Sequence, residues 1–401
     1  MIDTSLLNHT ELKLKELTKI LVQYNHNGNS SLLGGSAGVA FSLMHLAQIN
    51  KNERFYDKSI YLLEELIGQE NSKWTASGLS HSGLSGIAWM INFMIKHEMI
   101  ETDTEELLEE VDSTLKHYCV SLPFEDKPSL DFLHGLQGIA FYFLQRDNSD
   151  NLLDLILSHL EYQAIRESDN SLKWIFTNAL YNTSSYNLSL SHGISSIIGI
   201  MIAYVKNETF VIRAKKILEG AIKYLIKNQL DLNSHASYFP SVIPLEHNSG
   251  TQNTGSSRLA WCYGDLGIAY QLYEAGLILN NVELTEYAIK VLEYNSSRID
   301  EHSHHGIVDA GLCHGAAGVA LIYDLMASKS NSTIFRETSQ YWLKQAISFA
   351  NHKDGLAGFK SFHHPHFQND YSLLEGISGI ALLFSNAIKK NPYPWHEFLL
   401  L

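Results

Sequence analysis

The fold of this chain is decided by a short stretch, Gly315-Ala316-Ala317-Gly318-Val319-Ala320, in which two glycines three positions apart lead into an apolar run. The same six-residue frame occurs six times in the 401 residues, and a seventh copy, which begins at Gly193, has Ser196 in place of its second glycine. A branched aliphatic residue fills the fifth position of all seven copies, and alanine fills the sixth position of six. Such recurrence predicts a repeat architecture. The first glycines of the copies are Gly35, Gly83, Gly135, Gly193, Gly264, Gly315 and Gly376.

Amphipathic segments lie between the frames, among them residues 102–116, which start acidic and end basic, and residues 210–227. Each repeat therefore predicts two helices. One is amphipathic, and the other is apolar, buried and begins at the frame. Seven apolar helices with alanines at matching heights can pack into an inner ring. We expect an all-α fold, an α/α toroid (barrel) of seven inner and seven outer helices, as a single domain over residues 1–401. A linear solenoid is the alternative, but solenoids usually end in polar capping repeats, and the last frame here is as apolar as the first.

Charge and composition exclude several classes of function. The chain has 29 basic and 43 acidic residues, a net charge of −14, and no basic block that could follow a phosphate backbone, so nucleic acid is not an expected partner. No apolar run reaches the ~18 residues of a membrane span, and the N-terminus has no signal-peptide pattern. We expect a cytoplasmic protein in which three cysteines are thiols or metal ligands rather than a disulfide framework.

Ligand-type residues gather immediately before the frames, where they would share one end of the ring. The position before the first glycine holds His134, His192, Tyr263, His314 and Glu375 in five of the seven copies, and the position before that holds Cys262 and Cys313 in adjacent repeats.

Two cysteines and a histidine that converge in this way predict a zinc site made by Cys262, Cys313 and His314. Three protein ligands leave a fourth position open, which is typical of a catalytic zinc. The alternative is that both cysteines are small buried residues at helix starts and that His314 is a hydrogen-bonded core histidine. For His134 a backbone hydrogen bond is the favoured interpretation, and Cys119, which fits no frame position, is expected to pack an outer helix.

The segments around these residues resemble a known family. Arg258 followed by Trp261-Cys262-Tyr263-Gly264, together with Cys313-His314-Gly315, is similar to the motif pair of lanthionine synthetase C-like cyclases and their eukaryotic relatives. Ser191-His192-Gly193 and Asp131 through Gly135 extend the resemblance, which covers all seven repeats.

The resemblance implies an α/α toroid that binds one Zn²⁺ through Cys262, Cys313 and His314. It also implies an enzyme that adds peptide cysteine thiols to dehydroalanine or dehydrobutyrine in a dehydrated precursor peptide. The family's acid/base histidine corresponds to His192, its orienting aspartate to Asp131, its enolate-stabilising arginine to Arg258 and its tyrosine near the metal to Tyr263. A dehydratase and an exporter complex are further implied partners. Ser196 departs from the family pattern and could shift the loop that carries His192.

The chemistry also follows from the residue types. A cysteine thiol with a pKa of ~8.5 is mostly protonated at neutral pH, and Zn²⁺ removes the proton. Attack on a dehydroamino acid creates an enolate, which Arg258 could stabilise while His192, held by Asp131, protonates the α-carbon. Simpler alternatives are a surface ion pair for Arg258 and a helix cap for Asp131.

Two irregular segments are expected near the mouth of the ring. Residues 228–257, in the longest gap between frames, are rich in Ser, Asn, Gly and Thr and predict a loop or short strands that could form one wall of a peptide cleft. Residues 361–367 contain clustered histidines and could form part of the rim.

Other functions remain open at this point. Addition of a small thiol such as glutathione to dehydrated protein residues would use the same site. A zinc-containing scaffold without chemistry is less favoured, because it needs neither His192, Asp131 nor Arg258. A glycosidase on a helical toroid is disfavoured, because Cys and His occupy the positions where paired carboxylates would be required.

Overall fold

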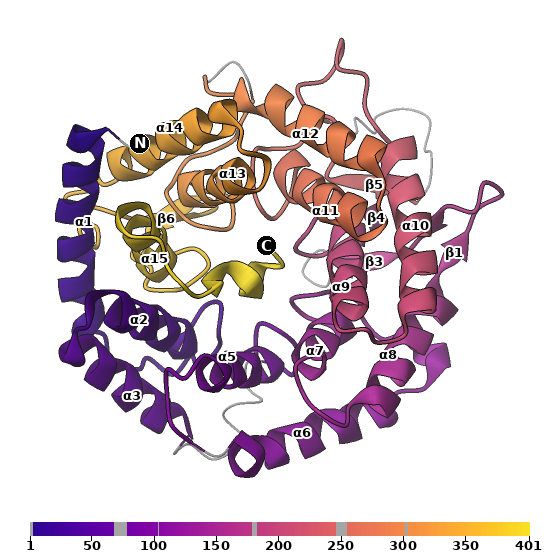
Figure 1. Cartoon of the computed structure of the whole chain (residues 1–401), viewed down its shortest axis with the longest axis horizontal. Coiled ribbons are helices and arrows are strands. Elements are labelled where there is room, and N and C mark those ends of the chain that lie inside the picture. The colour runs from indigo at the N-terminus through magenta and orange to yellow at the C-terminus, as the bar shows by residue number, and fades with distance from the viewer. Residues whose placement is uncertain (1–2, 68–77, 103, 179–182, 246–254, 301–303) are drawn as a thin grey trace. The chain divides into compact units, whose positions relative to one another are not determined.

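A computed structural model describes residues 3–67, 78–102, 104–178, 183–245, 255–300 and 304–401 (Figure 1). The chain divides into two compact units. Unit 1 comprises residues 1–78, 82–107 and 307–399, and unit 2 comprises residues 79–81, 108–306 and 400–401. The expectation of a single domain over residues 1–401 stays a prediction.

Unit 1 contains four apolar helices, each of which begins directly after its frame glycine. Among its amphipathic helices, α3 packs on α2, α14 on α13 and α1 on α15. Strands β6 and β7 form an antiparallel hairpin, where residues 361–367 were expected to be irregular. The apolar helices are α2 (Ser36–Asn50), α5 (Leu84–Lys96), α13 (Ala316–Ser330) and α15 (Ile377–Ile388), and the other elements are α1 (Thr4–Val22), α3 (Glu53–Ile67), α14 (Thr333–Ser348), β6 (Ser361–His363), β7 (His366–Gln368) and the 3₁₀ helix η4 (Trp395–Leu399).

The last repeat of unit 1 contacts the first. Helix α15 packs against α2, the Ser42 hydroxyl donates to the Ser378 carbonyl at 2.9 Å, and the Leu374 amide donates to the Leu33 carbonyl at 3.0 Å. Within unit 1, the first and last repeats are therefore direct neighbours.

Unit 2 contains three apolar helices, of which α9 contacts both α7 and α11. The amphipathic helices α8, α10 and α12 pack on α7, α9 and α11 in turn. The predicted helices near residues 102–116 and 210–227 correspond to α6 and α10. The apolar helices are α7 (Leu136–Phe143), α9 (Ile194–Lys206) and α11 (Asp265–Ile278), and the amphipathic ones are α6 (Thr104–Val120), whose first four residues belong to unit 1, α8 (Asp150–Gln163), α10 (Val211–Lys227) and α12 (Val282–Ser296).

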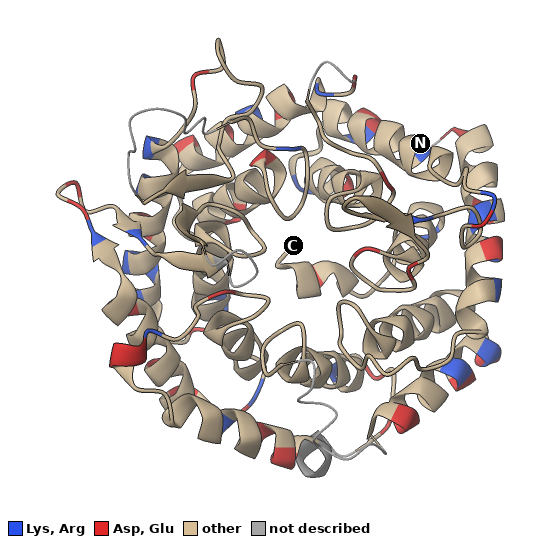
Figure 2. Ribbon diagram, turned by 180° about the vertical axis from the view of Figure 1, so that it is seen from behind, with Lys and Arg blue, Asp and Glu red and all other residues tan. Residues whose placement is uncertain are grey.

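Charge separates the two kinds of helix. Figure 2 shows far more charged residues on the amphipathic helices than on the apolar ones. The described chain thus has the seven apolar and seven amphipathic helices that the repeats predict. Within the described residues, no helix combines the length and hydropathy that a bilayer-spanning segment needs. The charged residues of the seven apolar helices are Lys96, Lys206, Asp265, Glu274, Asp324 and Lys329.

Strands in unit 2 were only partly expected. The segment 228–257 is irregular, as predicted, and contributes one strand, β5 (Val242–Pro244); its residues 246–254 lie outside the described part. This strand completes an antiparallel sheet in the order β3-β4-β5 with β3 (Phe176–Asn178) and β4 (Thr183–Asn187). Strands β3 and β4, and also the hairpin of β1 (Ile165–Arg166) and β2 (Leu172–Lys173), were not predicted, because such short strands carry no clear apolar alternation in the sequence.

Candidate active site

The loops before the apolar helices share one turn. In five of the six loops in which this position is described, the side chain six positions before the frame glycine accepts a hydrogen bond from the backbone amide two residues later. The repeats that the sequence predicted are therefore equivalent at the level of single hydrogen bonds. The pairs are Asn29 with Ser31 (3.0 Å), Ser129 with Asp131 (3.3 Å), Asn187 with Ser189 (2.9 Å), Asp309 with Gly311 (3.0 Å) and Asp370 with Ser372 (2.7 Å).

Neighbouring loops are also joined to each other inside each unit. In unit 2 the Cys262 carbonyl accepts from the amides of Leu190 (3.0 Å) and Ser191 (3.4 Å). In unit 1 the Leu374 carbonyl accepts in the same way from Leu312 and Cys313, both at 3.0 Å. The residues before the frames thus lie side by side at one end of the apolar helices.

His192, in the loop before α9, contacts the side chain of Asp131, in the loop before α7. The distance from His192 Nδ1 to Asp131 Oδ2 is 2.7 Å. The other carboxylate oxygen of Asp131 accepts from the His134 amide at 2.9 Å, so Asp131 caps its own turn and orients His192 at once. Burial lowers the pKa of His192, but the hydrogen bond and charge of Asp131 outweigh burial and raise the pKa above the usual value.

Two aromatic rings flank His192. The His134 ring stacks on it with ring centroids 5.5 Å apart, and the Tyr263 ring lies with its centroid 5.9 Å away. Asn187 Nδ2 donates to the Tyr263 hydroxyl at 3.3 Å. Burial lowers the pKa of His134, which leaves His192 as the histidine of this pair that holds a proton more readily.

Ser196 does not displace the loop that carries His192. Its hydroxyl donates to the Gly193 carbonyl at 2.7 Å, within the first turn of α9. Gly193 has φ −139° and ψ −159°, close to the −143° and −163° of Gly135 in the preceding repeat. Serine at position 196 therefore leaves the backbone at the start of α9 in the same conformation as in the preceding repeat.

Arg258, Cys262 and Tyr263 lie in the loop before α11, also in unit 2. Arg258 is exposed, Tyr263 is half-buried and Cys262 is 5% exposed. The Cys262 carbonyl accepts a hydrogen bond from the Ser191 amide. The loop that carries Cys262 therefore contacts the loop that carries His192.

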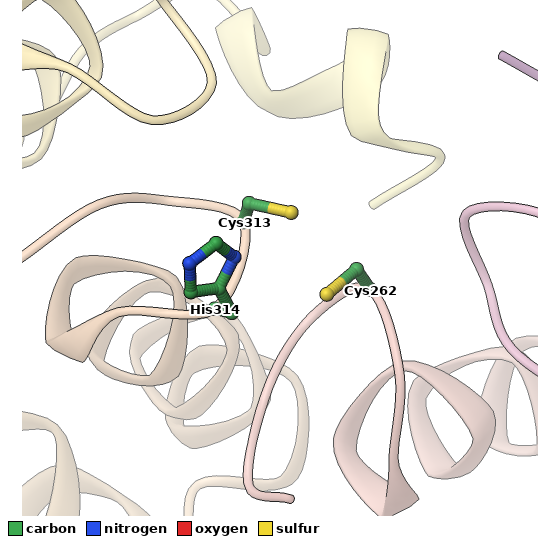
Figure 3. A group of neighbouring side chains, drawn as sticks. All are labelled: Cys262, Cys313 and His314. Carbon is green, nitrogen blue, oxygen red and sulfur yellow. The ribbon is translucent and has the colours of Figure 1, made fainter. Parts of the chain in front are cut away.

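Cys313 and His314 lie in the loop before α13 in unit 1 (Figure 3). Two acidic side chains flank the His314 ring. Its Nδ1 is 3.4 Å from Glu375 Oε2 and its Nε2 is 3.8 Å from Asp309 Oδ2. No role was predicted for these acids, although the repeats place Glu375 at the same frame position as His314.

Cys119 has the structural role that was predicted for it. It lies in α6, is 1% exposed, and burial raises the pKa of its thiol to about 12. A thiol so strongly protonated is a poor metal ligand and a poor nucleophile.

The chain is similar to known proteins over nearly its whole length. Residues 26–400 match the family model described as "Lanthionine synthetase C-like protein". The chain belongs to this family. One relative is the "Nisin biosynthesis protein NisC" of Lactococcus lactis subsp. lactis. It is 23% identical over 429 residues, which cover 99% of this chain and 97% of that protein.

A solved structure described as "Nisin cyclase" has the same fold. The TM-score is 0.73 at 21% identity, and the match covers 96% of each chain. The predicted family and the all-α fold class are thereby confirmed.

Proposed function

We propose that this chain is a zinc-dependent lanthipeptide cyclase, which adds cysteine thiols of a dehydrated precursor peptide to dehydroalanine or dehydrobutyrine and so forms (methyl)lanthionine rings. The observation that carries the proposal is the hydrogen bond of His192 to Asp131, in a loop that is joined to the loop of Cys262. Membership of the family and the likeness to NisC support it.

The proposed metal ligands are Cys262, Cys313 and His314. Figure 3 draws the three side chains, of which Cys262 comes from unit 2 and Cys313 and His314 from unit 1. Two thiolates and one imidazole fit zinc, and three ligands leave a position for the substrate thiol. The acids beside His314 are suited to hold its ring in one orientation, as carboxylates near zinc-bound histidines do.

A bound zinc ion would hold the substrate thiol as a thiolate at neutral pH. The sulfur then forms a bond with the β-carbon of the dehydroamino acid, and the electron pair of the double bond moves to the amide oxygen. The guanidinium of Arg258 stabilises this enolate, and the His192 imidazolium, oriented by Asp131, delivers a proton to the α-carbon. Tyr263 restricts the space beside His192.

Addition of glutathione is the main alternative, because it would use the same residues. A scaffold without chemistry is less consistent with the His192–Asp131 pair, since such a role needs no polarised histidine. The dehydratase, the exporter complex and the cytoplasmic location stay predictions.

The deciding experiment uses a dehydrated peptide that contains cysteine. On addition of the enzyme the peptide should lose its alkylatable thiol without a change in mass, because intramolecular addition moves atoms only within the peptide. If glutathione is present and is added with its full mass while the peptide thiols stay alkylatable, the alternative holds instead.

Shortening residues 248–256 should impair this reaction more than it impairs zinc binding, since segment 228–257 is the proposed wall for a peptide. Most of this stretch lies outside the described residues, so the prediction rests on the sequence and on the described flanks.

A further inference from the structure

The loop of the fifth repeat differs from its equivalents at the position of Arg258. Arg258 lies six residues before Gly264, where five other repeats carry the Asn, Ser or Asp that caps the turn. A guanidinium has only donors and cannot accept the amide hydrogen bond that those side chains accept. Gly264 also has φ +137°, in the region that favours glycine, whereas Gly135 has φ −143°. The loop that presents Arg258 must therefore be held in another way.

Backbone hydrogen bonds hold the chain on both sides of Arg258. The Ser257 amide donates to Ser237 Oγ at 2.8 Å, and the Ser257 carbonyl accepts from Arg298 Nη2 at 2.8 Å. On the other side, the Leu259 amide donates to the His305 carbonyl at 2.7 Å. Arg258 itself stays exposed between two buried neighbours.

Arg298, just after the end of α12, connects these supports. It is 3% exposed, and its Nη2 also donates to the His304 carbonyl at 2.9 Å. One guanidinium nitrogen thus joins the residue before Arg258 to the segment that supports the residue after it. A lysine ammonium could not reproduce this planar, branched geometry.

A chain of buried polar groups fixes Arg298 in turn. Its Nη1 donates to Asn295 Oδ1 at 2.9 Å, and Asn295 Nδ2 donates to Asp265 Oδ2 at 2.9 Å. Asp265, fully buried at the start of α11, accepts from the amides of Tyr238 (2.7 Å) and Phe239 (2.9 Å). Buried charges are tolerated when they are hydrogen-bonded and have an opposite charge nearby, and Asn295 links Asp265 to Arg298 in this way.

We infer that Arg298 is a positioning residue for Arg258. The hydrogen bonds of Arg298 take the place of the side-chain cap that the loop of the fifth repeat lacks. The inference rests on the proposed role of Arg258 as the group that stabilises the enolate. A loop held at both neighbours keeps an exposed arginine in one place, and a misplacement of about 1 Å can cost a reaction about 100-fold.

A double-mutant cycle tests this inference. The variants Arg258→Lys, Arg298→Lys and the double variant are compared with the unchanged protein for the rate of thiol loss from a dehydrated peptide, for zinc content and for Tm. We expect Arg298→Lys to slow the reaction by about 10- to 100-fold with unchanged zinc content. The double variant should be no slower than Arg258→Lys, within about twofold, because Arg298 acts through Arg258.

Arg146→Lys is the matched control. Arg146 is another largely buried arginine of unit 2, and its Nη2 donates to Asp112 Oδ2 at 2.8 Å. Its replacement should lower Tm but leave the rate within about twofold. If Arg298→Lys does not fold, Asn295→Ala, which removes one partner of the guanidinium, is used in the same cycle.

Rates that fall multiplicatively in the double variant would overturn the inference, as would an unchanged rate or a loss of zinc in Arg298→Lys. These results differ from a failure of the proposed function. In that case Arg258→Lys would itself react as fast as the unchanged protein.

Discussion

His192 Nδ1 lies 2.7 Å from Asp131 Oδ2, although 61 positions separate the two residues in the sequence. The contact joins the loops of two adjacent repeats. The second carboxylate oxygen of Asp131 accepts a hydrogen bond from the His134 amide. This bond fixes the carboxylate in the orientation in which it contacts the imidazole. In the proposed function, this pair is the site of proton transfer.

Replacement of His192 should remove proton delivery but leave the metal ligands in place. We expect His192→Asn to retain zinc and a normal Tm, and to lose cyclisation by about 100-fold or more, the usual scale for an acid/base group. His134→Asn is the control, since its ring stacks on His192 and burial lowers its pKa, which leaves it less protonated and therefore the poorer proton donor. Full turnover by His192→Asn would transfer the role to His134.

The rate should fall as the pH rises through the pKa of His192, because the imidazolium is the proton donor. Asp131 raises this pKa against the opposing effect of burial, so the charged form persists to higher pH. In Asp131→Asn both effects of Asp131 that raise the pKa are lost while burial still lowers it, and the fall in kcat/KM should move to lower pH. Profiles of thiol loss for both proteins between about pH 5 and 8 measure the shift. Identical profiles would show that Asp131 does not tune this histidine.

The purified protein should carry about one zinc ion per chain, as expected of a single three-ligand site. Cys262→Ala, Cys313→Ala and His314→Ala should each weaken zinc retention far more than Cys119→Ala, because only Cys119 lies in an outer helix away from the loops. Elemental analysis after dialysis against a chelator gives the result. A Cys262/Cys313 double variant with full zinc content would end the argument for the metal site.

Gly38 should not tolerate a side chain. A Cβ atom there would lie 2.2 Å from the Leu32 carbonyl oxygen and 2.6 Å from Leu373 Cβ, in the last repeat. We expect Gly38→Ala to destabilise the protein by about 1–3 kcal/mol, the usual cost of overpacking, and to lower Tm. Ser196→Gly, at the equivalent frame position of the fourth repeat, should cost only about 0.5–1 kcal/mol. Equal Tm values for Gly38→Ala and the unchanged protein would contradict the close contact of the first and last repeats.

The sequence by itself determined the repeats, the two kinds of helix and the positions of the candidate site residues. These features depend on local patterns, since apolar periodicity selects helices and a frame repeated seven times assigns equivalent places to distant residues. That is why Cys262, Cys313 and His192 could be singled out without a structure.

Only the tertiary structure decided which side chains support these residues. Arg298 and Asp265 form hydrogen bonds with backbone carbonyls and amides. Every residue type has these backbone groups, so the sequence does not indicate which residues are contacted. Asp309 and Glu375 flank His314 only because three loop positions converge in space. Short strands such as β4 form where a partner strand supplies hydrogen bonds, and that pairing is a long-range property which no local pattern contains.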